Sequence, residues 1–147
     1  MFPTFSSLSL PLTVKMLRPI LRLRMKVEHL AEYKLVAERS RFFAVLFPAA
    51  GEEDVLKMVR LKKGELRKAS HHCWAFRGQG GERSRDDGEV GHPGRVLLEL
   101  LRHHDLEGGL LVSRVFGGVK LGVGGVSRAF RDAGDGAIAE YKKDIRR

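Results

Sequence analysis

The residues best suited to bind an anion lie in one stretch, 109–137, which predicts a strand, a glycine-rich turn and a helix in succession. The mainly apolar run 110–116 is typical of a buried strand, and apolar residues from Val126 to Ala137 recur at helical spacing. Between them, five glycines fall within nine positions. Such a turn directs unpaired backbone N–H groups and the positive end of the helix dipole toward whatever lies above it. The predicted anion or nucleic-acid site consists of Arg114, Gly117, Gly118, Lys120, Gly122, Gly124, Gly125 and Arg128.

Glycines between a strand and a helix can instead serve only a tight turn and close packing, because glycine takes positive φ freely. The spacing here matches neither common phosphate-binding pattern. No Lys-Ser or Lys-Thr pair follows the glycines, as G-x-x-x-x-G-K-[ST] requires. Ser127 stands where G-x-G-x-x-G, started at Gly122, has its last glycine. An anion site and purely structural glycines therefore both remain open.

Asp86, Asp87 and Glu89 form a tight group of carboxylates. Paired carboxylates can bind a metal ion or act as general acid and base. Here Arg83 and Arg85 precede them directly, and the Asp-Gly pair favours a turn. We therefore predict a turn that neutralises itself by local ion pairs, and no metal site.

Cys73 follows two histidines, a pairing that could make a cysteine nucleophile with its base. In a strand, Cys73 and His71 share one face while His72 points to the other. The sequence shows no third, orienting partner at a recognisable spacing. We therefore predict a buried Cys73 packed with Ala75, and no catalytic residue.

Aromatic and histidine residues give weaker signals. Trp74, Phe76 and Phe116 could stack on nucleobases if exposed, although aromatic residues on alternating strands are more often part of the core. We place Trp74 and Phe76 on opposite faces of their strand, so that only one need be buried. His103 and His104 end a predicted helix, where a cationic side chain is favoured, and we expect them to cap it.

Composition restricts the class of protein. The chain has 147 residues, which favours one domain, and a net charge of +9, which indicates nucleic acid, an anionic ligand or an acidic protein surface as partner. Four of these charges lie in residues 1–24, and solubility alone could account for the remaining +5. Its single cysteine excludes an internal disulfide and fits a reducing compartment, so a cytoplasmic location is expected. No apolar run approaches the roughly 18–20 residues of a membrane span, so no membrane partner is expected. No cofactor is predicted.

Residues 1–24 differ from the rest, because they hold three prolines, four basic residues and no acidic residue. The basic residues follow the apolar ones, which is the reverse of a secretory signal. An organellar transit segment remains open, as does an artefactual extension with translation starting at Met16 or Met25. We predict a disordered or artefactual extension at 1–24 and a single domain at 25–147. Removal of the extension is expected to leave the fold intact.

The periodicity of the remaining chain indicates an α+β fold. A sheet that begins with a hairpin and is then interrupted by helices favours a mixed sheet of about four strands, with helices mainly on one face. A flexible turn at 78–81 and a charged, turn-rich segment at 82–89 are also expected. The predicted strands are near 33–37, 42–47, 70–77 and 110–116, and the predicted helices near 52–67, 93–101 and 126–137.

Three segments resemble, in order and spacing, the signatures of the IMPACT/YigZ family. Residues 112–130, VSRVFGGVKLGVGGVSRAF, are similar to the family pattern [VT]-[TS]-R-x-[FY]-G-G-x-K-L-G-x-G-G-L-x-R-A-[YF]. Residues 40–42, SRF, resemble the opening K-S-R-F, with Arg39 for the lysine. Residues 71–77, HHCWAFR, and 82–89, ERSRDDGE, are similar to H-N-C-[YW]-A-[YF]-R and R-S-x-D-D-G-E.

The resemblance implies a ribosomal protein S5 domain 2-like fold and no established enzymatic activity. Eukaryotic members modulate translation by competing for the activator of the amino-acid-starvation kinase, and bacterial members are thought to bind nucleic acid. The sequence departs from the pattern after Glu89, where the family's P-x-G-T-A-G-R-P has become VGHPGRV. The further site candidates that the motifs imply are Arg41, His71, Arg77, Arg83, Asp86, Asp87, Glu89 and Arg95.

Two functions follow. We predict a non-enzymatic, translation-linked regulatory module that binds RNA, or a ribosome-associated partner, through a basic groove beside the glycine-rich loop. The alternative is a small-anion or nucleotide-binding protein, with or without enzymatic activity, that uses residues 117–125 at a helix N-terminus. An enzyme would need a general base near that loop. No Asp, Glu or His lies between Leu110 and Arg131, so the base would have to come from 86–89.

Overall fold

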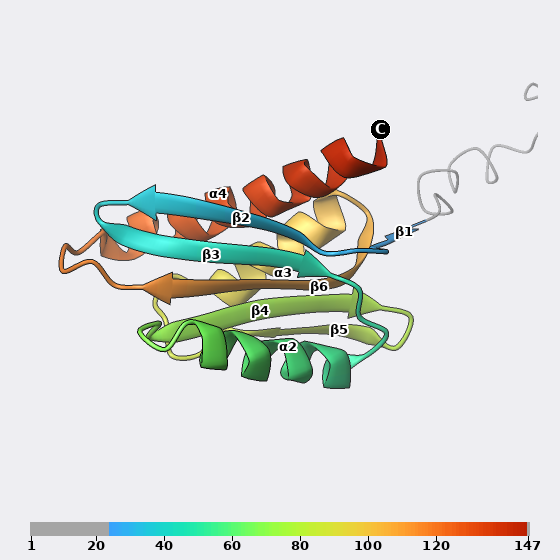
Figure 1. Cartoon of the computed structure of the whole chain (residues 1–147), viewed down its shortest axis with the longest axis horizontal. Helices are drawn as coiled ribbons and strands as arrows, with labels where there is room; N and C mark the ends of the chain where they lie inside the picture. The colour runs from blue at the N-terminus through green and yellow to red at the C-terminus, as the bar shows by residue number, and fades with distance from the viewer. Residues whose placement is uncertain (1–23, 147) are drawn as a thin grey trace, which may run out of the picture.

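The computed structural model describes residues 24–146, so the predicted extension at 1–24 lies outside the described residues except for Arg24. One sheet carries helices on both of its faces (Figure 1). No helix within the described part is both long and apolar enough to cross a membrane. The elements are β1 (Met25–Lys26), β2 (Ala31–Ala37), β3 (Ser40–Phe47), α2 (Glu52–Glu65), β4 (His71–Gly78), β5 (Gly81–Arg85), α3 (Pro93–His103), β6 (Leu106–Val115) and α4 (Gly122–Ile145).

Strand β6 is the centre of the sheet. The strand order is β2-β3-β6-β4-β5 with all neighbours antiparallel, and β1 pairs in parallel with the first residues of β6. Because β6 has neighbours on both edges and helices over both faces, its side chains are buried along nearly its whole length. A strand buried on both faces is expected to have a continuous apolar sequence, as this one does.

Alternation along β6 divides the core into two layers. Leu110 and Val112 pack in the layer under α3 and α4, and Leu111 packs in the layer under α2. In the first layer, Phe42 of β3 meets Phe130 of α4 edge to face, with ring centroids 5.2 Å apart. Two of the three helices in the described part cover one face. The predicted α+β sheet with helices mainly on one face is therefore confirmed.

Within residues 24–146 the sheet has six strands, where about four were predicted. The two additions, β1 and β5, lack an apolar pattern. β5 lies in the segment predicted to be turn-rich, and backbone pairing with β4, from Gly78–Gly81 to Trp74–Arg85, defines it as a strand. It is an edge strand with largely exposed, charged side chains. Charged side chains on an edge strand oppose pairing with another chain. They also leave the strand without an apolar alternation, so its sequence does not predict it.

The aromatic residues of β4 correct one prediction. Trp74 and Phe76 are two residues apart and therefore share one face, so their placement on opposite faces was wrong. Both are buried beneath α2, with Val55 and Leu111. Neither can stack on a ligand in this arrangement, whereas Phe116 is exposed.

The strand directions bring four connections to one end of the sheet, at the left of Figure 1. They are the turn at 38–39 and the segments 66–70, 86–92 and 116–121. Helices α3 and α4 also begin at this end and run toward the other. We call it the glycine end, after the glycines of the last segment, and the opposite end the far end.

Candidate functional site

The glycine-rich connection between β6 and α4 is held against the turn between β2 and β3. The backbone N–H of Gly117 donates to Ser40 Oγ at 3.2 Å. A Cβ on Gly117 would overlap the carbonyl group of Arg39, so a side chain does not fit there. Gly118 has a φ of 87°, in the left-handed region that favours glycine. These two glycines shape the loop, whatever it binds.

At the start of α4, Gly122 shapes the backbone as Gly118 does, because its φ of 75° also lies in the left-handed region, but the space beside Gly122 and Gly124 is open. A Cβ on Gly122 or Gly124 would meet no atom within 4 Å, whereas one on Gly125 would lie 3.1 Å from Leu121 Cβ. The N-cap Leu121 makes no side-chain capping hydrogen bond, and the first turn of α4 holds no acidic residue. The first N–H groups of a helix have no partner within it. The start of α4 is therefore an uncapped, positively polarised helix end.

A groove of about 540 Å³, here called the α4 groove, lies beside this helix end. It brings together β4, the glycine-rich loop, the 86–92 segment and the first turns of α4. None of the described residues that line it is acidic. They are Ser70, His71, Val90, Arg114, Phe116, Lys120, Leu121, Gly122, Val123 and Val126.

Arg114 forms part of the wall of this groove, and its charge is already paired. The residue is only 6% exposed. Its Nη1 donates to Oε2 of Glu89, whose side chain is buried, at 3.0 Å, and its Nη2 donates to Ser40 Oγ at 3.3 Å. The guanidinium carbon lies 5.4 Å from the ring centroid of Phe116. Its Nε has no hydrogen-bond partner among the described residues.

The three predicted cations do not converge on one groove. Lys120 lines the α4 groove together with Arg114, and it also lines a second groove of about 480 Å³, where Arg128 lies. Within residues 24–146, Lys120 and Arg128 have no ion-pair partner. Lys120 is therefore the unpaired cation that stands between the two grooves, while Arg114 acts mainly as a structural wall.

The carboxylates at 86–89 are used inside the protein. Asp86 Oδ1 accepts the backbone N–H of Gly94 at 2.8 Å, and Asp87 Oδ2 accepts that of His72 at 2.8 Å. Together with the pairing of Glu89 to Arg114, these bonds fasten the segment to α3, β4 and β6.

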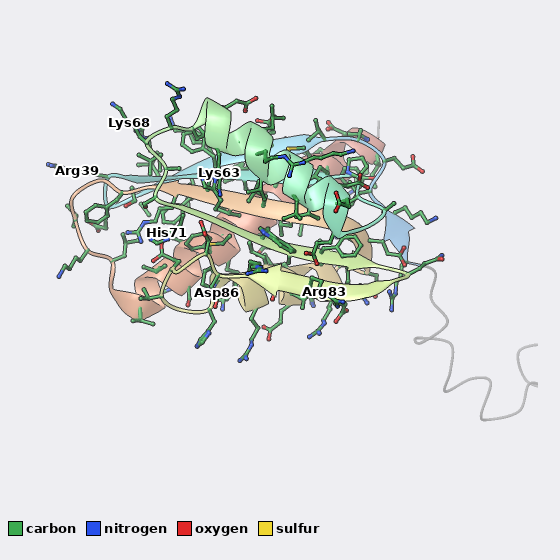
Figure 2. All side chains as sticks on the ribbon, turned by 90° about the horizontal axis from the view of Figure 1, so that it is seen from below. Arg39, Lys63, Lys68, His71, Arg83 and Asp86 are labelled. Carbon is green, nitrogen blue, oxygen red and sulfur yellow. The ribbon has the colours of Figure 1, made fainter. Side chains whose placement is uncertain are left out.

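The predicted local ion pairs are not the ones observed. Arg83 pairs instead with Glu52 of α2, with Nε and Oε1 3.7 Å apart, because its place in β5 turns it away from the segment (Figure 2). Within residues 24–146, no group of three or more His, Cys, Asp or Glu side chains is placed to hold a metal ion.

Cys73 is fully buried beside Ala75 in the layer under α3 and α4, as predicted. Its Sγ donates to the carbonyl oxygen of Asp86 at 3.1 Å. Burial raises the pKa of the Cys73 thiol, and the nearby carboxylates raise it further. His71, on the same strand, turns its Nδ1 to the carbonyl oxygen of Asp87 at 2.8 Å. The two side chains have separate partners, and Cys73 stays a neutral thiol.

Three of the remaining candidates lie away from the α4 groove. Arg77 is buried at the far end, where its Nε donates to Glu82 Oε2 at 3.0 Å and its Nη1 to two backbone carbonyls. Arg41, half-buried on β3, and Arg95, exposed on α3, do not line the groove.

Sequence reasoning considered Phe116 but missed two other apolar residues of the groove. Val90 and Val123 are exposed and line it, but Val90 lies outside the quoted motifs and Val123 occupies a variable position of the 112–130 pattern. Val90 is an apolar residue in an otherwise charged and polar segment, and that contrast was the available signal.

These observations define a class of protein: an α+β domain in which a glycine-rich loop and an uncapped helix start border a groove without acidic side chains. The family model of the Impact N-terminal domain matches residues 38–138, and the chain belongs to this family. The predicted resemblance is thus confirmed.

Two curated relatives and one solved structure are similar to the chain. An IMPACT family member of Thermus thermophilus, described as lying in the pol 5' region, is 41% identical over 96 residues, 65% of this chain and 52% of the relative. The IMPACT family member YvyE of Bacillus subtilis is 33% identical over 109 residues, 71% of this chain and 50% of the relative. The chain thus spans about half the length of these relatives. The crystal structure of a hypothetical protein aligns with a TM-score of 0.73 at 26% identity, over 80% of this chain and 60% of that one.

Proposed function

We propose that this chain is a non-enzymatic, translation-linked regulatory module that binds RNA through its phosphate backbone at the start of α4. Membership of the Impact family supports the link to translation. The observation that carries the binding proposal is the uncapped α4 start, with open glycines and the unpaired Lys120, beside a groove without acidic side chains. Backbone N–H groups, a helix dipole and a lysine are together suited to a phosphate.

The charge around this end supports an extended anion more than a small one. Arg39, Lys63 and Lys68 lie at the glycine end with His71 (Figure 2). None of the three cations has an ion-pair partner within residues 24–146. Positive charge spread over a turn, the last turn of α2 and the segment that follows it attracts a polyanion and raises its association rate. Cations that contact phosphates do not contact the edges of the bases, so we expect the RNA to bind with weak sequence preference.

Binding is favoured over catalysis because the nearest candidate base is occupied. Glu89 is the carboxylate of the 86–89 segment that reaches the groove wall. Its Oε2 accepts from Arg114, and its Oε1 accepts the N–H of Val90 at 3.0 Å. A general base must reach the proton that it removes, and both oxygens here are turned to structural partners.

The test measures binding of a labelled single-stranded RNA to the full chain by fluorescence anisotropy over a range of salt concentrations. Lys120→Ala should weaken binding to every sequence and reduce the log–log salt slope by about 0.7, the loss of one phosphate contact. The matched control is Lys26→Ala, which removes an exposed lysine at the far end and should leave binding unchanged.

Two results would overturn the proposal. One is binding that does not respond to salt, or that responds equally to both variants. The other is binding of inorganic phosphate or a mononucleotide as tight as that of RNA, which would establish the alternative small-anion site. A ribosome-associated protein partner would be indicated if Lys120→Ala abolished ribosome association while free RNA did not bind.

A further inference from the structure

The α4 groove exposes more apolar surface than a phosphate needs. Val90 is 50% exposed, Phe116 49% and Val123 60%, and all three line this groove. They come from three separate parts of the chain: the 86–92 segment, the glycine-rich loop and the first turn of α4. Apolar side chains that gather in one groove, next to cationic residues, make that groove a candidate for ligand binding.

Phe116 is positioned by the arginine beside it. The Arg114 guanidinium lies over the Phe116 ring and is itself held by Glu89 and Ser40. The arginine is nine-tenths buried, lines the groove, and keeps its Nε without a partner among the described residues. A ring held in this way and still half exposed presents a rigid aromatic surface to the groove.

The groove therefore joins two kinds of chemistry at one place. Its volume of about 540 Å³ lies within the range of about 300–1,000 Å³ that is usual for small-ligand sites. One part is apolar and aromatic, around Phe116 and Val123. The other part is the uncapped start of α4 with Lys120. The groove suits a ligand that carries a flat apolar group and a negative charge a short distance apart.

We infer that the α4 groove binds one unpaired nucleobase of a single-stranded nucleic acid, stacked on Phe116, with an adjoining phosphate at the start of α4. A nucleotide has both groups in one unit, and bases stack on aromatic side chains without strict sequence preference. Bases within a duplex are already stacked on their neighbours, so the groove selects single strands. This inference rests on the proposed function and adds to it the strandedness and the base contact.

The experiment compares three probes of equal length: a single-stranded oligoadenylate, the same strand annealed in a duplex, and an abasic oligonucleotide that keeps the phosphates. Oligoadenylate should bind tightest. Phe116→Leu, which keeps an apolar side chain but removes the ring, should weaken its binding by roughly 5- to 150-fold, the usual loss of one base stack. Binding of the abasic probe should not change. Phe116→Trp should retain the binding of oligoadenylate.

Leu61→Ala is the control for apolar truncation, because Leu61 is 52% exposed, close to the 49% of Phe116, and lies on α2 outside the α4 groove. A urea unfolding curve for each variant verifies that it is folded.

The inference fails if the abasic probe binds as tightly as oligoadenylate, or if the duplex does. The proposed function survives in those cases, provided that binding still depends on salt and on Lys120. If no probe binds in a salt-dependent way, both fail. An acidic, aromatic peptide that binds more tightly than oligoadenylate, and loses its binding in Phe116→Leu, would assign the groove to a protein partner instead.

Discussion

Helices α3 and α4 begin at the same end of the sheet, yet their N-termini are satisfied differently. At α3, Pro93 occupies the first turn and the N–H of Gly94 donates to Asp86 Oδ1 at 2.8 Å. The protein thus supplies its own carboxylate to this helix end. At α4, the N-cap Leu121 offers no side-chain acceptor and the first turn has no acid. Both ends have the same positive polarity, so the difference lies in whether an anion is built in.

The same segment, 86–92, contacts both helix ends. Ser127 Oγ of α4 donates to the carbonyl oxygen of Gly91 at 2.6 Å, and Gly91 lies in the segment that carries Asp86. The same segment is fixed to β6 through Glu89 and Arg114. The N-terminus of α3 is therefore capped by a carboxylate and that of α4 is not, although both contact the same segment. The start of α4 therefore lacks the built-in carboxylate that α3 has, and this supports our proposal that it is the end that binds an external anion.

The largest effect is expected from loss of the ion pair between Glu89 and Arg114, which holds the 86–92 segment to β6. Glu89→Gln removes the charge that faces Arg114 and leaves a buried guanidinium without its counter-ion. Loss of one partner of a buried ion pair costs about 3–5 kcal/mol of the free energy of unfolding. Urea unfolding followed by circular dichroism measures it.

The control variant is Glu99→Gln, on the exposed surface of α3, which should change the free energy of unfolding by no more than about 0.5 kcal/mol. Equal costs for the two variants would show that the segment is not held by its buried ion pair.

The next effect separates the glycines that shape the loop from those at the open helix end. Gly117→Ala places a methyl group against the carbonyl of Arg39 and should cost about 1–3 kcal/mol, as overpacking does. Gly124→Ala meets open space in the first turn of α4 and should be neutral or stabilise by up to about 1 kcal/mol.

Phosphate titrations followed by amide NMR shifts give the second readout. Gly124→Ala should weaken the response of residues 122–126 although the fold is intact. If Gly124→Ala proved the more destabilising of the two, the division of the glycines would be wrong.

The sequence was sufficient for the elements that the core requires. β3, β4 and β6 are apolar over most of their length, and α3 and α4 have apolar stripes, so periodicity located all five. β1 and β5 have no such pattern, since backbone pairing alone defines them. The open helix end was predicted because the glycines and Lys120 are local in sequence.

The burial of Arg114 could not be predicted, because its partners are distant along the chain. Glu89 lies 25 positions away and Ser40 lies 74 positions away, and only the order of strands brings them together. For the same reason, the sequence predicts ion pairs of Asp86 and Asp87 with the neighbouring arginines. Their acceptor oxygens in fact serve backbone N–H groups of α3 and β4.

A smaller effect tests the closed helix end directly. Asp86→Ala removes the carboxylate at the start of α3 and should cost about 0.5–2 kcal/mol, the usual value of a helix N-cap. If the built-in carboxylate is what closes this end, the variant should also gain a phosphate-dependent amide shift at Gly94. An unchanged Gly94 amide in a folded Asp86→Ala protein would mean that something other than the carboxylate closes α3.

The smallest effect concerns the opposite ends of the same two helices, where His104 of α3 contacts Lys142 of α4. His104, the C-cap residue of α3, accepts from Lys142 Nζ of α4 at Nδ1, 2.7 Å away, and its Nε2 lies 3.4 Å from Asp135 Oδ1. Burial is the main cause that lowers the pKa of His104 below 6.5, with Lys142 next, and Asp135 opposes the shift. The folded protein therefore takes up a proton at His104 less readily than the unfolded chain does.

The sign of the pH dependence follows from that difference. The contribution of His104 is fully present above its ordinary pKa, near 6.5, and is lost as the pH falls toward the lowered value in the folded state. The free energy of unfolding, measured in urea at about pH 7.5 and about pH 5.5, should fall on acidification, and His104→Gln should reduce that fall. Burial also lowers the pKa of His72, so part of the acid sensitivity should remain in this variant. A His104→Gln protein with the full acid sensitivity would show that the paired C-termini do not contribute. The contrast between the two helices would then be confined to their N-termini.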